Sequence, residues 1–145
     1  LSLLAANHVR DFSEHHKNRI VKSTIAGNVM VAGNSEQLSR MISNVLSNIS
    51  RHTPEDAEVD IVVSKIDGQA ILVFDDAGPG LSAELYARTR ECFQRFDRAH
   101  SKTGGGFGLG LSILSSIVQR HEGTLSMSVS PLGGLRTQIS LKLAR

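Results

Sequence analysis

Two adjacent carboxylates follow an apolar stretch of the sequence, residues 70–74, and precede a Gly-Pro-Gly run. Alternation along a strand places Asp76 on the same side as Leu72 and Phe74, at the rim of the buried face. A carboxylate at this rim needs a hydrogen-bond partner, and the glycines after it let a flat ligand approach the backbone. A turn that only closes the strand accounts for the same residue types.

A second group of polar residues lies on an expected helix, in the segment NVLSNISRHT. Asn44 and Asn48 are four residues apart, so their amides share one face, and Arg51 and His52 follow one turn later. Asn is unfavourable inside a helix because its side chain competes for backbone hydrogen bonds. The pair is either two solvated amides or a set of oxygen ligands for a hard cation such as Mg²⁺, completed by phosphates.

The third group is the glycine-rich segment 101–113, SKTGGGFGLGLSI, which leads into an expected helix. Bare backbone amides at a helix N-terminus favour anions such as phosphate, although a flexible linker has the same composition. The sequence lacks GxxxxGK[ST], which excludes a P-loop. GPGLSA fits the dinucleotide fingerprint loosely, but no second strand ending in an acid follows at the expected distance.

The elements that position the first two groups are predicted from apolar spacing and turn residues. Leu1, Leu4, Ala5, His8 and Phe12 predict a short opening helix, and residues 19–33 predict a hairpin turning at Gly27-Asn28. A capping-box pattern of Asn34 and Gln37 starts the next helix, which Thr53-Pro54 ends. Its predicted core stripe is Leu38, Met41, Ile42, Val45, Leu46 and Ile49.

The second half of the sequence predicts two hairpins around a loop and a helix. Asp67-Gly68 joins two strands, and residues 88–107 form a long loop. A helix runs from Gly108 towards Gly123, with Leu111, Leu114, Ile117 and Val118 on one face, and two alternating strands joined by PLGG close the chain. The fold class is α+β, an antiparallel-rich sheet with helices on one face.

Composition narrows the function classes. The chain has 145 residues, a formal charge of +2 with scattered basic residues, and a single cysteine. These values favour one domain in a reducing compartment and give no support to nucleic-acid binding. No apolar run reaches the length of a membrane span, so we expect no membrane insertion by this chain. Because it starts at Leu1 rather than Met, it is interpreted as part of a longer protein.

In order, the chain carries N-x-x-x-N, D-x-G-x-G, FQRF and G-x-G-L-G-L. This order resembles the catalytic ATP-binding domain of bacterial two-component sensor histidine kinases, in the GHKL superfamily shared with gyrase, heat-shock chaperones and mismatch-repair ATPases. The resemblance covers essentially the whole chain, and FQRFDR is similar to the F box of the histidine kinase branch. It implies a two-layer α/β sandwich, the Bergerat ATPase fold, with a mixed five-stranded sheet, about three helices on one face and an ATP lid at about 88–107.

The resemblance also implies roles for individual residues. Asp76 accepts a hydrogen bond from the adenine amine, and Gly78 and Gly80 make room for the ring. Asn48 binds Mg²⁺ with the ATP phosphates, supported by Asn44. The remaining implied ATP-binding residues are Arg51 near the phosphates, His52 beside the base, and Gly106, Phe107, Gly108, Leu109, Gly110 and Leu111 at the start of the helix.

The lid carries the remaining implied roles. Phe93 and Phe96 anchor it, and Arg95 and Arg98, with Asn48 and Arg51, make up the catalytic set. Some positions depart from the family pattern. Phe107 replaces a small hydroxyl residue, Ile49 stands where Ala is common, and Arg51 and His52 replace Lys and an aromatic residue.

The implied function is to bind ATP with Mg²⁺ and donate the γ-phosphoryl group to a histidine, for relay to an aspartate of a response regulator. The acceptor histidine belongs to a dimerisation domain of the same protein, which we expect upstream of residues 1–145. Alone, the chain is expected to turn over little ATP. The parent protein is expected in the inner membrane with this domain in the cytoplasm. The alternatives are a degenerate nucleotide-binding or non-catalytic interaction module, for which Phe107 argues, and a serine-kinase relative of the anti-sigma type.

Overall fold

The computed structural model describes the backbone of residues 1–95 and 108–145 and the side chains of residues 1–90 and 111–145. The elements follow in the order α1 (Ser2–His15), β1 (Val21–Ile25), α2 (Ser35–His52), β2 (Val59–Ile66), β3 (Gln69–Asp76), α3 (Ala83–Arg95), α4 (Gly108–Arg120), β4 (Thr124–Val129) and β5 (Leu135–Lys142).

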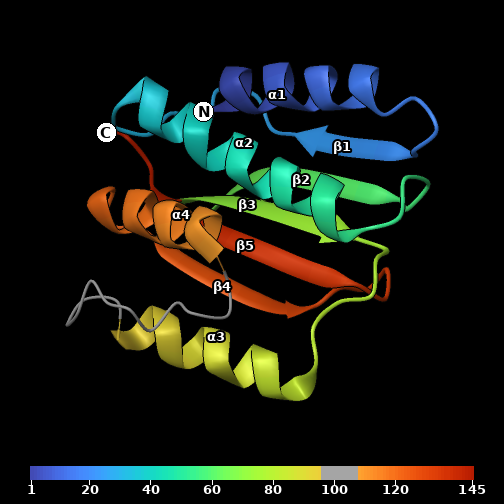
Figure 1. Ribbon diagram of the computed structural model, residues 1–145. Coiled ribbons are helices and arrows are strands. Elements are labelled where there is room, and N and C mark those ends of the chain that lie inside the picture. The colour runs from blue at the N-terminus through green and yellow to red at the C-terminus, as the bar shows by residue number, and fades with distance from the viewer. Residues whose placement is uncertain (96–107) are drawn as a thin grey trace.

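The strands form one five-stranded sheet in the order β1-β2-β3-β5-β4. β1 and β2 are parallel, and the other neighbours are antiparallel. Helices α1, α2 and α4 cover one face, while α3 lies beside β4 at the far edge (Figure 1). This confirms the expected α+β sandwich with a mixed five-stranded sheet. None of the described helices combines the length and apolar character that crossing a membrane requires.

The core lies between this helical layer and the sheet. All six residues of the predicted α2 stripe are buried, and so are Leu111, Leu114, Ile117 and Val118 of α4. They pack over alternate residues of the central strands, among them Ile61, Leu72, Phe74 and Ile139. The amphipathic faces predicted from the sequence are therefore the faces that fold against the sheet.

Helix α2 begins where the capping pattern predicts, but a distant residue completes its cap. Asn34 Oδ1 accepts a hydrogen bond from the Gln37 N–H at 3.0 Å. The Asn34 N–H donates to His121 Nε2 at 3.2 Å, from the end of α4, rather than to the side chain of Gln37. Thr53, the residue before Pro54, caps the other end through its N–H, which donates to Ile49 O at 3.1 Å.

The predicted hairpin over residues 19–33 is wrong. β1 pairs with β2, with Val21 opposite Val59, and Val31 makes only an isolated bridge to Leu143. Val29 is fully buried. Its N–H donates to Ser2 Oγ at 2.8 Å and its carbonyl accepts from the Leu1 amino group at 2.9 Å. The start of α1 therefore supplies the hydrogen bonds that a second hairpin strand would have taken from β1.

The predicted loop over residues 88–107 is wrong for its first part, because α3 continues to Arg95. The N–H of Leu85 donates to Ser82 Oγ at 3.2 Å at the start of this helix. Tyr86 and Thr89 are buried, a narrow face that does not give the wide apolar stripe of an ordinary amphipathic helix. Residues 96–107, the rest of the predicted lid, lie outside the described residues.

The two predicted turns differ in how well the sequence located them. Asp67 and Gly68 have φ values of 49° and 79°, as the hairpin between β2 and β3 requires. After α4, however, the left-handed residue is Glu122, with φ 55°, one position before the expected Gly123. A Cβ on Gly123 would lie 2.5 Å from Ser140 O, so this glycine is required by close packing against β5.

Candidate functional site

A cavity of about 360 Å³ opens between the C-terminal half of α2, the start of α4 and the ends of β3, β4 and β5. Its apolar walls include Ile49, Leu114 and Met127. The lining residues are Val45, Asn48, Ile49, His52, Thr53, Asp76, Pro79, Gly80, Leu81, Leu111, Leu114, Met127, Leu135 and Thr137. A few polar groups in a mostly apolar hollow are the usual composition of a small-molecule site.

Asp76 lines this cavity and is held by backbone hydrogen bonds. Only 4% of its surface is exposed. Asp76 Oδ1 accepts from the Gly78 N–H at 2.9 Å and from the Leu135 N–H at 3.2 Å. Both bonds use Oδ1, so Oδ2 is the carboxylate oxygen available to a donor group of a ligand.

Asp75, the neighbouring carboxylate, points to the other face of the sheet and has a different role. Its two oxygens accept from Arg136 Nε and Nη2 on β5, both at 2.9 Å. The hydrogen bonds to Asp75 raise the pKa of Arg136 above its ordinary value, while burial of the guanidinium opposes that shift. The alternation of β3 thus assigns one aspartate to the fold and the other to the cavity.

Two glycines lie against the Asp76 carboxylate, and a third lines the same cavity. A Cβ on Gly78 would lie 2.5 Å from Thr53 Cγ2, and Gly80 has a left-handed φ of 67° and lines the cavity. A Cβ on Gly134 would collide with Asp76 Oδ1 and would lie 2.7 Å from the Gly78 nitrogen. Sequence analysis treated Gly134 only as part of a turn. The paired glycines of PLGG were the signal that could have suggested a close approach.

The two asparagines of α2 occupy different positions. Asn48 lines the cavity, and its Oδ1 accepts from Arg51 Nη2 at 3.3 Å. Asn44 lies outside the lining, and its Nδ2 is buried without a hydrogen-bond partner among the described residues. A buried donor without a partner costs about 1–3 kcal/mol, so this amide favours a bound partner such as a water or a ligand.

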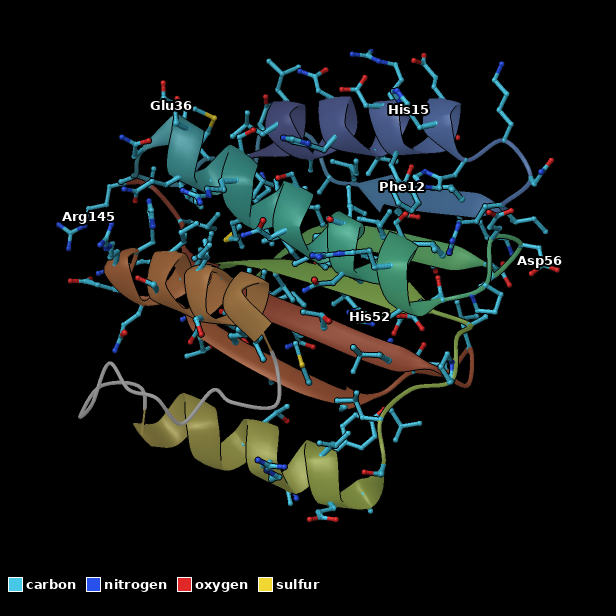
Figure 2. All side chains as sticks on the ribbon, viewed as in Figure 1. Phe12, His15, Glu36, His52, Asp56 and Arg145 are labelled. Carbon is cyan, nitrogen blue, oxygen red and sulfur yellow. The ribbon has the colours of Figure 1, made fainter. Side chains whose placement is uncertain are left out.

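Arg51 and His52 diverge at the end of α2. His52 lines the cavity, and Figure 2 shows it on the last turn of the helix, on the side towards the sheet. Arg51 lies instead along the groove between α1 and α2. The structure therefore brings the histidine to the cavity, and the arginine reaches it only through its hydrogen bond to Asn48.

The glycine-rich segment contributes the first turn of α4. Gly108, Leu109 and Gly110 form this turn, and Leu111 lines the cavity directly after it. The first N–H groups of a helix have no acceptor within the helix, so this turn, next to the cavity residue Leu111, is a favourable location for an anion. The backbones of Phe93 and Arg95 belong to α3. Phe96, Arg98, Gly106 and Phe107 lie outside the described residues.

Two further cavity residues were missed by sequence analysis. Thr53 was interpreted only as a helix stop, and its side chain forms part of the wall. Thr137 is 4% exposed on β5, opposite Phe74 of β3 and Met127 of β4. The alternation of the last strand placed Thr137 on the buried face, and a hydroxyl among apolar neighbours was its signal.

Comparison with known proteins shows the family of this chain. Residues 33–145 match the family described as "Histidine kinase-, DNA gyrase B-, and HSP90-like ATPase". The chain belongs to this ATPase family. Among the described residues, no cluster of three or more His, Cys, Asp or Glu side chains could hold a metal by itself.

Relatives within this ATPase family are sensor histidine kinases. The sensor histidine kinase CpxA of Escherichia coli (strain K12) is 40% identical over 111 residues, which are 77% of this chain and 24% of CpxA. The signal transduction histidine-protein kinase BaeS of the same strain is 30% identical over 136 residues, 92% of this chain and 29% of BaeS. The chain therefore lies on the histidine kinase branch and spans about a quarter of the length of these relatives.

A solved structure agrees with this placement in the ATPase family. The mycobacterial sensor histidine kinase MprB superposes with a TM-score of 0.73 at 27% identity. The alignment covers 97% of this chain and 93% of that chain. The similarity thus extends over α1 and β1, which both precede the segment matched by the family.

Proposed function

We propose that this chain binds ATP with Mg²⁺ in the cavity and donates the γ-phosphoryl group to a histidine on a dimerisation domain of the same protein. The observation that carries the proposal is Asp76, a buried carboxylate in the wall of a mostly apolar cavity with Oδ2 available to a ligand. Membership of the ATPase family and relatives that are sensor histidine kinases support it.

The expected recognition of adenine follows from the chemistry around Asp76 in the cavity wall. Asp76 Oδ2 accepts a hydrogen bond from the exocyclic amine of the base, whose faces pack against apolar walls such as Ile49 and Met127. Guanine carries a carbonyl oxygen where adenine carries the amine, and a second acceptor facing a buried carboxylate is repelled. His52 lies on the cavity wall, where its imidazole ring is placed to stack on the base.

The phosphates extend from the base towards α4, where the N–H groups of Gly108 and Gly110 bind them. Asn48 supplies an amide oxygen from the cavity wall for a metal ion. Asn44, whose Nδ2 has no hydrogen-bond partner among the described residues, supports the phosphate end by donating to a phosphate oxygen. The amide oxygen of Asn48 fits Mg²⁺, which takes the rest of its ligands from phosphate and water. When bound, Mg²⁺ neutralises charge on the phosphates.

Phosphoryl transfer needs little covalent chemistry from this chain, because its task is to position the γ-phosphate and stabilise its charge. We assign Arg95 and Arg98 as the cations that serve this purpose, with Phe93 and Phe96 anchoring the lid segment. Arg51 is assigned to the same purpose from the groove between α1 and α2, where its hydrogen bond to Asn48 connects it to the cavity wall. The nucleophile is a histidine on the dimerisation domain, and the phosphoryl group then passes to an aspartate of a response regulator. This arrangement corresponds to a cytoplasmic domain of a kinase anchored in the inner membrane.

The first test is calorimetric titration of the chain with the ATP analogue AMPPNP plus Mg²⁺. We expect saturable one-to-one binding to the wild type and a loss of at least about tenfold in affinity for Asp76→Asn, because the amide turns a donor towards the adenine amine. Asp75→Asn is the matched control: it changes the adjacent carboxylate on the other face and is expected to keep wild-type affinity.

Two outcomes would contradict the proposal. Absence of binding to the folded wild type would favour the alternative of a non-catalytic interaction module. Equal losses of AMPPNP affinity in Asp75→Asn and Asp76→Asn would show that Asp76 does not bind the base. Transfer is tested separately, by incubating the chain with ATP and the dimerisation domain of its parent protein. Acid-labile labelling of that domain is expected, and acid-stable labelling would instead favour a serine kinase.

A further inference from the structure

Arg19 is a buried cation that the proposed nucleotide chemistry does not use. It lies between α1 and β1 and only 6% of its surface is exposed. Within the described part of the chain it forms no ion pair, and its Nε is buried without an acceptor. Burying a guanidinium without a carboxylate is costly, so the hydrogen bonds that the side chain does form must offset that cost.

The side-chain hydrogen bonds of Arg19 go to the segment that connects α2 to β2. Its Nη1 donates to Thr53 Oγ1 at 2.7 Å and to the Ala57 carbonyl at 3.3 Å. These two acceptors stand at the two ends of the connection, so one nitrogen fixes both ends. Thr53 Oγ1 in turn donates to the Ile49 carbonyl at 2.6 Å, which fixes its rotamer.

Thr53 connects this buried arginine to the cavity. Its side chain forms part of the cavity wall. Its methyl carbon packs directly against the backbone of Gly78, where an added Cβ would lie only 2.5 Å away. The Gly78 N–H is one of the two donors that hold Asp76 Oδ1. A displacement of Thr53 is therefore transmitted to the carboxylate within two contacts.

The other side of Arg19 rests on α1. The guanidinium carbon lies 5.7 Å from the centroid of the Phe12 ring. The ring of Phe12 stacks on His16 at 4.2 Å, and His16 Nε2 is hydrogen-bonded to Ser50 Oγ of α2 at 3.0 Å. Phe12 projects from α1 towards the sheet (Figure 2). Arg19 is thus held from one side by α1 while it holds Thr53 on the other.

We propose that Arg19 is a positioning residue for the base end of the cavity, acting through Thr53 on Gly78 and Asp76. The proposal rests on the proposed function, since the base is the ligand that Asp76 receives. It predicts that Arg19 changes nucleotide affinity without touching the nucleotide, and that Thr53 carries the effect.

The test combines amide exchange in the free protein with calorimetry of AMPPNP plus Mg²⁺. In Arg19→Met, protection of the Gly78 N–H is expected to fall while that of Leu72, at the centre of β3, stays at its wild-type value. Affinity is expected to fall about 3-fold to 30-fold. Thr53→Val removes the acceptor and keeps the shape, and adding Arg19→Met to Thr53→Val is expected to weaken binding no further.

A structural role alone gives a different pattern. It would lower protection of Gly78 and Leu72 together and leave the affinity of the folded fraction unchanged, which would overturn the proposal. Independent, additive losses in the double variant would overturn it too. Arg19→Lys keeps the charge but has a single donor nitrogen. It replaces Arg19→Met in the test if that variant fails to fold. It is expected to bind more weakly than wild type, and wild-type affinity with wild-type Gly78 protection would contradict the proposal.

A failure of the underlying function would look different again. If the wild type binds no nucleotide, the calorimetric arm has no signal in any variant, and the proposal that Arg19 positions a nucleotide site is overturned with the function. The exchange arm then still reports whether Arg19 controls Gly78. Nucleotide binding by the wild type with an unchanged Gly78 amide in Arg19→Met overturns the positioning role alone.

Discussion

At the scale of single residues, identical side chains have different roles because their surroundings differ. Asp75 and Asp76 are adjacent in the sequence. Asp75 forms a bidentate ion pair with Arg136, whereas Asp76 lines the cavity. Asn44 and Asn48 differ in the same way, since only Asn48 lines the cavity. Residue type alone therefore does not assign a role.

The metal role proposed for Asn48 is tested by Asn48→Ala. Affinity for AMPPNP with Mg²⁺ is expected to fall about tenfold or more, because one oxygen ligand is lost. Affinity in EDTA is expected to change little, since the base contacts remain. Alanine is the better helix residue, so the variant is expected to unfold at a temperature no lower than the wild type.

Ser47→Ala is the control for this experiment, because Ser47 is exposed on the neighbouring groove between α1 and α2. It is expected to bind as the wild type does with and without Mg²⁺. Equal losses for Asn48→Ala in Mg²⁺ and in EDTA would contradict a metal role and indicate a contact with the nucleotide itself.

At the scale of elements, the ends of the helices are set by partners from elsewhere in the chain. His121, at the end of α4, accepts the hydrogen bond from the first N–H of the α2 cap. Glu122 follows in a left-handed conformation, and the Gly123 N–H donates to the Val118 carbonyl at 2.9 Å. Gly123 cannot carry a Cβ because of Ser140, so the left-handed position falls on a residue poorly suited to it.

Glu122→Gly is therefore expected to stabilise the protein by about 0.5–1 kcal/mol, since glycine removes the steric cost of positive φ at a helix C-terminus. Urea unfolding at equal m-value measures the change. Gly123→Ala is the comparison, and it is expected to destabilise by about 1–3 kcal/mol through overpacking. A destabilised Glu122→Gly would show that the Glu122 side chain contributes more than its backbone strain costs.

At the scale of the whole molecule, the cavity exists only when the fold is complete. Its walls come from α2, the segment after β3, α4, β4 and β5, elements that span most of the described chain. The sheet order places β5 between β3 and β4, which brings Leu135 and Gly134 next to Asp76. A ligand of this cavity therefore binds the native state and not the unfolded chain.

This linkage predicts a ligand-dependent melting temperature. AMPPNP with Mg²⁺ at a hundred times its dissociation constant is expected to stabilise the fold by about 2.7 kcal/mol. For a chain of this size that corresponds to a rise in Tm of roughly 5–10 °C. Differential scanning calorimetry measures it, with the guanine analogue GMPPNP at the same concentration as the control. Equal shifts with both analogues would contradict adenine selection by Asp76.

The sequence by itself determined the features that depend on neighbouring residues. The stripe of α2, the Asn34 cap, the Asp67-Gly68 turn and the alternation that buries Asp76 all appear where they were predicted. Each is a local property, because helical spacing, strand alternation and turn dihedrals are set within a few residues. The order of the four motifs was likewise readable from the chain, and with it the ATPase family.

Only the tertiary structure decided which distant groups meet. It paired β1 with β2 instead of residues 29–33, turned residues 88–95 into helix, and brought Gly134 against Asp76 and Arg19 against Thr53. Such contacts are selected by competition among many segments for the same buried surface and hydrogen bonds. The outcome of that competition depends on the packing of all elements together, so no local pattern in the sequence specifies it.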